Sequence, residues 1–141
     1  MSKKKGTRAE RELFHLLWEH FGPCVRVAGS GSTPKPAPDL LAGNGQRTMA
    51  IECKSVKGDR KYFEYSEIMQ LKLFSRQFGA EPWIAIRFDN RGWFFVHSDN
   101  VEQSQGQSFL ISYDFALKSG LKFDELIGKY SQQRLPSEES L

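Results

Sequence analysis

Two predicted strands and the turn between them occupy the stretch Asp39-Leu-Leu-Ala-Gly-Asn-Gly-Gln-Arg-Thr-Met-Ala-Ile-Glu-Cys-Lys54. The segments Asp39–Ala42 and Arg47–Lys54 have the composition of β-strands, and Gly43–Gln46 contains the glycine and asparagine residues that favour tight turns. This stretch therefore predicts a β-hairpin.

The second strand of this hairpin carries charged side chains on one face. Side chains alternate along a strand, so Glu52 and Lys54 share a face, and Asp39 at the start of the first strand can bring a second carboxylate close to Glu52. Two converging carboxylates are costly unless a cation neutralises them, and oxygen ligands suit Mg²⁺ or Mn²⁺. The ammonium of Lys54 could orient a water or stabilise charge on a phosphate. The pattern predicts a phosphodiesterase site.

A simpler explanation of Glu52 and Lys54 is an exposed ion pair worth under about 1 kcal/mol. An acid followed by acid-x-Lys arises by chance in many chains, and Asp59-Arg-Lys61 is a second instance here. That second instance falls in a polar connection, whereas Glu52 lies on a predicted strand. From spacing alone, the exposed ion pair remains the better explanation.

Helical and extended patterns alternate along the rest of the chain. The spacing predicts three helices. The first starts at the capping box Thr7–Glu10 and ends before Gly22, the second spans Ser66–Phe78 with Gly79 as its stop, and the third spans Phe123–Gln133. Further strands are predicted at Cys24–Ala28, Pro82–Phe88 and Trp93–His97, and loops at Gly29–Pro38 (flexible) and Asn100–Ser108. The order predicts an α/β fold with a mixed central sheet flanked by helices.

Composition favours a soluble protein that meets a polyanion. The 141 residues suit one domain, which we place at 1–134 with a frayed tail at 135–141. We expect a cytoplasmic, nucleoid-associated protein, since the chain shows neither a membrane-spanning run nor a secretory signal. Residues 1–61 carry 12 Lys and Arg against 6 Asp and Glu, so the basic character lies in the first half.

Several other polar residues have simple structural explanations. Glu10 occupies the third position of the capping box, and Arg26 fits a solvated strand residue. The free thiols Cys24 and Cys53 suit buried packing. The basic residues near the N-terminus suit solubility; they are Lys3, Lys4, Lys5, Arg8 and Arg11. The three histidines, His15, His20 and His97, lack the spacing of metal ligands.

Several ordered motifs together resemble the archaeal-type Holliday junction resolvases, members of the PD-(D/E)xK nuclease superfamily. The matching segments are Lys5-Gly6, Ala9-Glu-Arg-Glu-Leu13, Arg26-Val-Ala-Gly-Ser30, Pro38-Asp-Leu-Leu-Ala-Gly-Asn-Gly45, Ile51-Glu-Cys-Lys54 and Phe74-Ser-Arg-Gln-Phe-Gly79. Ordered motifs at compatible spacing are more specific than the acidic residues and lysine alone, so they favour the nuclease interpretation over the surface ion pair.

The resemblance implies a restriction-endonuclease-like core and specific roles for individual residues. It implies that Glu10, Asp39 and Glu52 bind the metal, Mg²⁺ with Mn²⁺ as a substitute, and that Lys54 is the catalytic lysine. Arg26 and Ser30 would be needed for cleavage, although Ser32 could replace Ser30 because the stretch from Gly29 to Asp39 is longer than in the family. The implied DNA-binding residues are Lys3, Lys4, Lys5, Gly6, Arg8, Arg26, Ser30 and Ser32.

The function that the resemblance implies is resolution of four-way DNA junctions in recombination and repair. A homodimer with two active sites would cut two strands of like polarity and leave two ligatable duplexes. Recognition would rest on phosphates and branch shape rather than on base sequence. Two alternatives remain open: another repair or restriction-type endonuclease of the superfamily, and a non-catalytic nucleic-acid binding module on the same scaffold.

Overall fold

A computed structural model describes residues 2–27, 35–104, 106 and 108–128. The central sheet has the strand order β1-β2-β3-β5-β6, and a smaller sheet has the order β4-β8-β7. The strands are β1 (Cys24–Arg26), β2 (Leu40–Gly43), β3 (Thr48–Val56), β4 (Arg60–Glu64), β5 (Glu81–Phe88), β6 (Gly92–His97), β7 (Glu102–Gln103) and β8 (Ser108–Ser112). The helices are α1 (Ser2–His20), α2 (Tyr65–Phe78), η1 (Ser98–Asn100), α3 (Tyr113–Ser119) and α4 (Phe123–Leu126).

The central sheet is mixed, as the sequence predicts. Strands β3 and β5 pair in parallel, whereas β1 with β2, β2 with β3, and β5 with β6 pair antiparallel. The parallel pair requires a crossover, and α2 provides it because it lies between β3 and β5 in the chain. The predicted α/β fold with a mixed sheet is therefore confirmed.

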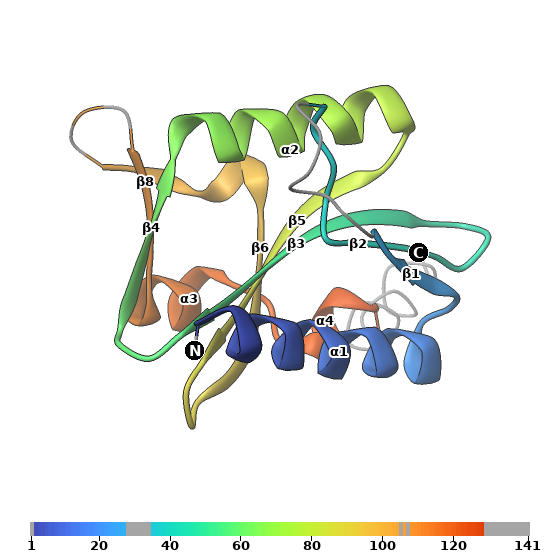
Figure 1. Cartoon of the computed structure of the whole chain (residues 1–141), viewed down its shortest axis with the longest axis horizontal. Coiled ribbons are helices and arrows are strands. Elements are labelled where there is room, and N and C mark those ends of the chain that lie inside the picture. Colours follow the sequence, from blue (N-terminus) through green and yellow to red (C-terminus); the bar gives the residue numbers. More distant parts are fainter. Residues whose placement is uncertain (1, 28–34, 105, 107, 129–141) are drawn as a thin grey trace, which may run out of the picture.

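Two apolar layers cover the two faces of this sheet. Along β3, Met49 and Ile51 belong to the layer beneath α1 and α4, whereas Ala50 belongs to the layer beneath α2. Helices α1 and α2 accordingly lie on opposite sides of the sheet (Figure 1). The alternation confirms the prediction that even-numbered and odd-numbered residues of β3 face opposite ways, and it places Glu52 and Lys54 on the α2 side.

Helix α1 begins earlier than predicted. It starts at Ser2, so Thr7 and Glu10 lie inside the helix and the predicted capping box is wrong as a helix start. Lysines are good helix formers and Gly6 is tolerated at a cost, so the pattern can extend toward the N-terminus without a local stop. Helix α2 matches its predicted span to within one residue and ends at Gly79, whose φ of +89° suits glycine.

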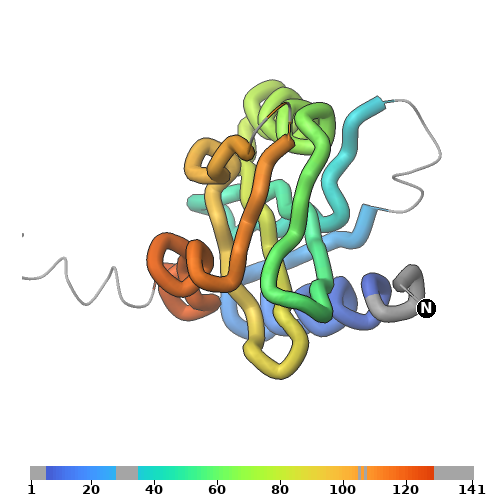
Figure 2. The backbone as a smooth tube through the Cα atoms, turned by 90° about the vertical axis from the view of Figure 1, so that its left-hand side faces the viewer, coloured from blue at the N-terminus to red at the C-terminus, as the bar shows by residue number. Residues whose placement is uncertain are grey.

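The small sheet was not predicted. The segment Asp59–Lys61 was interpreted as a polar connection, but Arg60 and Lys61 are the first two residues of β4. The predicted loop Asn100–Ser108 contains β7 and the first residue of β8. Strands β4 and β8 run side by side although they are far apart in the sequence (Figure 2), with Phe63 opposite Phe109. Such pairing depends on the surrounding fold rather than on local composition.

The C-terminal part also differs from the expectation. Helix α3 was not predicted, and α4 ends at Leu126, before the left-handed Gly128, whereas the predicted helix continued to Gln133. Residues 129–133 of that prediction, the tail 135–141 and most of the flexible loop predicted from Gly29 lie outside the described residues. Over the described part of the chain, no helix is long and apolar enough to cross a membrane.

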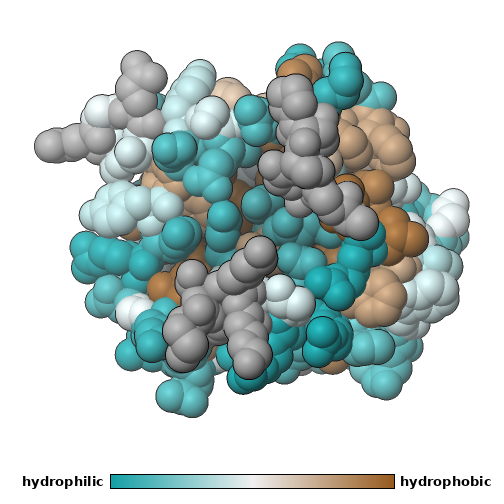
Figure 3. Space-filling model, viewed as in Figure 1, coloured by the Kyte–Doolittle hydropathy of each residue, from teal (hydrophilic) through white to brown (hydrophobic). Residues whose placement is uncertain are grey.

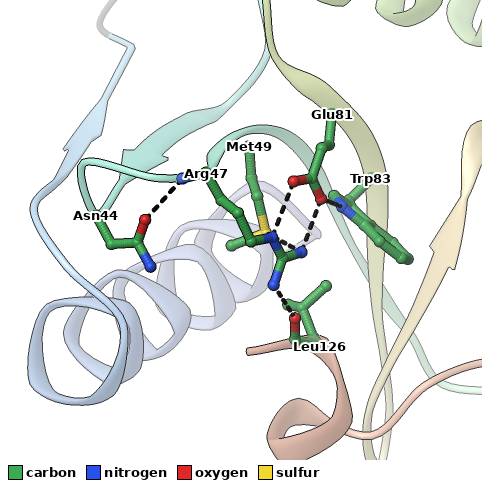
Figure 4. A network of polar contacts seen from close by, with 6 residues as sticks. All are labelled: Asn44, Arg47, Met49, Glu81, Trp83 and Leu126. Carbon is green, nitrogen blue, oxygen red and sulfur yellow. Dashed lines mark hydrogen bonds and ion pairs between the residues drawn. The ribbon is translucent and has the colours of Figure 1, made fainter. Parts of the chain in front are cut away.

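A polar network fastens the hairpin to the parallel strand pair and to α4. Two nitrogens of Arg47 donate to the two carboxylate oxygens of Glu81 at 2.7 and 2.9 Å, and a third donates to the carbonyl of Leu126 at 2.7 Å. The indole nitrogen of Trp83 also donates to Glu81 (Figure 4). Two-point pairing of this kind is geometrically specific, so Arg47 fixes the turn end of the hairpin against the start of β5.

Candidate active site

The ladder between β2 and β3 brings Asp39 and Glu52 side by side. Leu40 pairs with Ile51 in this antiparallel ladder, so the next pair, just before the start of β2, is Asp39 and Glu52. The Asp39 backbone N–H donates to the Ile51 carbonyl at 3.0 Å. The Cys53 backbone N–H donates to Oδ2 of Asp39 at 2.8 Å. The predicted convergence of the two carboxylates is therefore part of the sheet's own hydrogen bonding.

The two carboxylates share a poorly hydrated environment. Burial, followed by the charge of Asp39, raises the pKa of Glu52 to about 8, and Lys54 offsets only part of this effect. Burial also raises the pKa of Asp39; the Cys53 N–H and Lys54 act against it, and the charge of Glu10 adds to it. Both shifts show that negative charge is costly here, so a bound cation would be favoured.

Lys54 lies between two acidic side chains. Its Nζ is 3.8 Å from Oε2 of Glu52 and 3.0 Å from Oε2 of Glu67, which belongs to the first turn of α2. Burial lowers the pKa of Lys54, but the hydrogen bond to Glu67 and the nearby negative charges outweigh it and raise the pKa overall. Lys54 is therefore a cation next to the acidic pair and not an exposed ion-pair residue.

Glu67 is a member of the site that the sequence analysis missed. The only available signal was its place in the first turn of the predicted helix, where an acidic residue is already explained by the free backbone N–H groups. Its contact with Lys54 depends on how α2 packs over β3, which sequence spacing does not reveal.

Glu10 and Arg26 form an ion pair at the edge of the site. Nε of Arg26, on the edge strand β1, lies 3.2 Å from Oε1 of Glu10. The charge of Glu10 contributes to the raised pKa values of Asp39 and Glu52, so Glu10 is near both carboxylates. The capping explanation of Glu10 is wrong because Glu10 lies within α1, and Arg26 is an ion-pair partner rather than a merely solvated residue.

The remaining predicted site residues are less closely defined. Gly6 lies in α1 and Arg8 is exposed on it, whereas Ser30 and Ser32 lie outside the described residues. The backbone of Lys3, Lys4 and Lys5 is helical. Among the residues that the structure describes, no group of three or more His, Cys, Asp or Glu side chains is arranged to hold a metal ion. The metal set Glu10, Asp39 and Glu52 and the DNA-binding set stay predictions.

Comparisons with known proteins agree with the motifs and the geometry. The family model described as archaeal Holliday junction resolvase matches residues 1–135. The chain is 39% identical over 132 residues to crossover junction endodeoxyribonuclease Hjc of Archaeoglobus fulgidus, covering 94% of this chain and 96% of that protein. It is 32% identical over 136 residues to the protein of the same name from Methanocaldococcus jannaschii, covering 94% and 93%.

The fold comparison gives the same result. The solved structure of Hjc from Archaeoglobus fulgidus, a Holliday junction resolvase from an archaeal hyperthermophile, aligns with a TM-score of 0.78 and 34% identity. The alignment covers 88% of this chain and 96% of the solved chain. The mixed sheet with flanking helices is thus the restriction-endonuclease-like core that the sequence predicts.

Proposed function

Because the chain belongs to the archaeal Holliday junction resolvase family, we propose that it is an endonuclease that resolves four-way DNA junctions by paired symmetric phosphodiester hydrolysis. The observation that carries this proposal is the convergence of Asp39, Glu52 and Lys54 on the α2 side of the sheet. A protein that only binds DNA gains nothing from two adjacent, half-buried carboxylates, which in their charged forms repel both each other and a phosphate. We place this activity in recombination and repair in the cytoplasm.

We propose that the carboxylates of the site hold a magnesium ion, because oxygen donors of this kind suit that cation. Asp39 and Glu52 would supply oxygen donors, and burial, together with the charges of neighbouring carboxylates, raises the pKa of both groups; Glu10 is the third proposed ligand. When bound, Mg²⁺, or Mn²⁺ in its place, neutralises phosphate charge and lowers the pKa of a water molecule. Lys54 keeps its proton and holds a positive charge where negative charge develops on the phosphate during hydrolysis.

Recognition of the junction would rest on phosphates. Lysine and arginine outnumber acidic residues two to one in residues 1–61, and the exposed Arg8 lies on the same helix as Glu10. Contacts to phosphates orient a protein on DNA without reading base sequence. We therefore propose that branch shape, rather than sequence, selects the substrate, with Arg26, Ser30 or Ser32 close to the cleaved strand.

We further propose that the enzyme acts as a homodimer. A junction offers two strands of like polarity, which a two-fold symmetric pair of active sites can cut together. The outer face of α2 supports this proposal, because Leu73 is 41% and Phe78 is 56% exposed, and Phe78 stacks on Phe74. Hydrophobic residues gather around the C-terminal end of α2 in the space-filling view (Figure 3). Phe78→Glu should yield monomers in light scattering.

The decisive experiment compares a labelled four-way junction with a linear duplex of the same sequence, each with and without Mg²⁺. We expect paired nicks in the junction only, and only with the cation. Cleavage of the linear duplex at a comparable rate would indicate a repair or restriction-type endonuclease. Tight junction binding without cleavage in Mg²⁺ or Mn²⁺ would indicate a non-catalytic binding module.

A further inference from the structure

Both carboxylate oxygens of Glu67 have defined partners. Oε1 accepts a hydrogen bond of 3.0 Å from the backbone N–H of Glu64, at the start of α2. Oε2 lies 3.0 Å from Nζ of Lys54, on β3. The first contact fixes the carboxylate to the end of the helix, so the second contact holds the ammonium group at a defined place.

Lys54 needs such a partner because its side chain is long and flexible. Four rotatable bonds separate its ammonium from the strand, and fixing them has a large entropic cost. Nζ lies closer to Glu67 than to Glu52, at 3.0 Å against 3.8 Å, and it lies 5.9 Å from the centre of the Phe63 ring. The position of the ammonium is thus set by α2 and β4 as well as by its own strand.

We propose that Glu67 is a positioning residue that holds the Lys54 ammonium beside the Asp39 and Glu52 carboxylates, at the place where a phosphate would be hydrolysed. Its second effect is to leave Glu52 available for a cation, because the ammonium pairs more closely with Glu67. The inference rests on the proposed nuclease function and extends it to a residue outside the acidic residues and lysine of the motif.

The two contacts of Glu67 can be separated by one substitution. In Glu67→Gln, the side-chain oxygen can still accept the Glu64 N–H, since glutamine also serves at this position of a capping box. The amide nitrogen, which is a donor, would then face the Lys54 ammonium. The variant therefore keeps the helix start and no longer holds Lys54.

The test measures single-turnover cleavage of a four-way junction, junction binding without cation, and thermal melting. For Glu67→Gln we expect the cleavage rate to fall about ten- to hundredfold, as is usual when a supporting partner of a site residue is removed. Binding and melting temperature should stay within error. Glu64→Gln is the matched control: it removes the carboxylate charge of the neighbouring N-cap residue, whose side chain is exposed, while the glutamine oxygen can still accept in the capping box, so we expect the wild-type rate.

A double-mutant cycle shows whether Glu67 acts through Lys54. In a Lys54→Ala background, followed over long incubations, Glu67→Gln should cause no further loss. Full activity of Glu67→Gln, an equal loss in both backgrounds, or a rate loss matched by a lower melting temperature and weaker binding would overturn the inference. Failure of the proposed function is distinguishable, because the wild-type protein itself would then leave junctions uncut.

Discussion

The backbone N–H of Cys53 donates a 2.8 Å hydrogen bond to Oδ2 of Asp39. This bond joins the carboxylate at the start of β2 to the strand that carries Glu52 and Lys54. A side chain that is hydrogen-bonded to the adjacent strand has little freedom to turn away from its neighbour. The acidic pair is therefore held together by the sheet even though both carboxylates have raised pKa values.

Asp39→Asn should abolish most cleavage while preserving the fold. The asparagine oxygen can still accept the Cys53 N–H, so junction binding and melting temperature should be close to wild type, while a charged ligand is removed. We expect cleavage to fall by two or more orders of magnitude, as is typical when electrostatic groups of an active site are removed. Asp59→Asn, in the second acid-x-Lys pattern, is the control and should cut normally. Retained cleavage in Asp39→Asn would refute the assigned site.

Glu52 should make the metal-free protein less stable as the pH rises. Its pKa is raised from 4.5 to about 8, so between these pH values the folded protein holds a proton that the unfolded chain has released. The contribution of Glu52 to the free energy of unfolding is therefore full below pH 4.5 and is lost as the pH rises toward 8. In a chelator, Glu52→Gln should melt at a higher temperature than wild type at pH 8.5.

Melting temperatures at low pH provide the control for this prediction. At pH 4.5, where the folded wild-type protein carries a protonated Glu52, the two melting temperatures should be close. A Glu52→Gln variant that melts lower than wild type at pH 8.5 would contradict the raised pKa. Glu64→Gln, a substitution of an exposed acid, should show no such dependence on pH.

Local patterns predicted the part of the fold that builds the acidic pair. The turn Gly43–Gln46 and the alternation along β3 are set by neighbouring residues, so the hairpin and the shared face of Glu52 and Lys54 are predictable from sequence. The convergence with Asp39 follows from hairpin register. The ordered motifs then separated this pattern from chance, which spacing alone did not do.

The features of the fold and of the site that were not predicted depend on contacts between segments distant in the sequence. Strand β4 is stabilised by its pairing with β8, which lies far away in the sequence. The composition around Asp59–Lys61 does not reveal this pairing, so the segment was interpreted as a polar connection. The contact of Lys54 with Glu67 requires α2 to pack over β3, which local patterns do not reveal. Helix α1 starts at Ser2, before the sequence Thr7–Glu10, so this capping-box sequence does not cap the helix. Glu10 lies inside α1, so its explanation as a capping residue is wrong, and its role as a metal ligand stays a prediction.

Glu10→Gln should test the remaining predicted metal ligand. Glu10 lies inside α1, where glutamine has a similar helix propensity, and its exposed ion pair with Arg26 contributes little to stability. We expect the melting temperature to change little and the cleavage rate to fall at least tenfold. Glu19→Gln, also on α1 and exposed, is the control. Normal cleavage in Glu10→Gln would remove Glu10 from the active site.

Arg47→Met should destabilise the protein without a direct effect on the reaction. The substitution removes the two hydrogen bonds to Glu81 and the one to the Leu126 carbonyl, and it leaves the Glu81 carboxylate without its two-point partner. We expect a loss of about 2 kcal/mol in the free energy of unfolding, measured by urea denaturation. The double variant Arg47→Met, Glu81→Leu should recover part of the loss, since it leaves no unpaired charge. Additive losses would show that the pair is not coupled.

Junction binding should weaken steeply with salt, because neutralised phosphates release counterions. Binding of a fixed junction, measured without divalent cation at several salt concentrations, should give a strongly negative slope of log affinity against log salt. Arg8→Gln removes an exposed charge from α1 and should make this slope shallower by about one for each phosphate that Arg8 neutralises in the wild-type complex. Lys118→Gln removes an exposed charge from α3, in the acidic half of the chain, and should leave the slope unchanged. A slope that is flat in the wild-type protein, together with preference for one base sequence, would instead indicate recognition through bases and would contradict selection by branch shape.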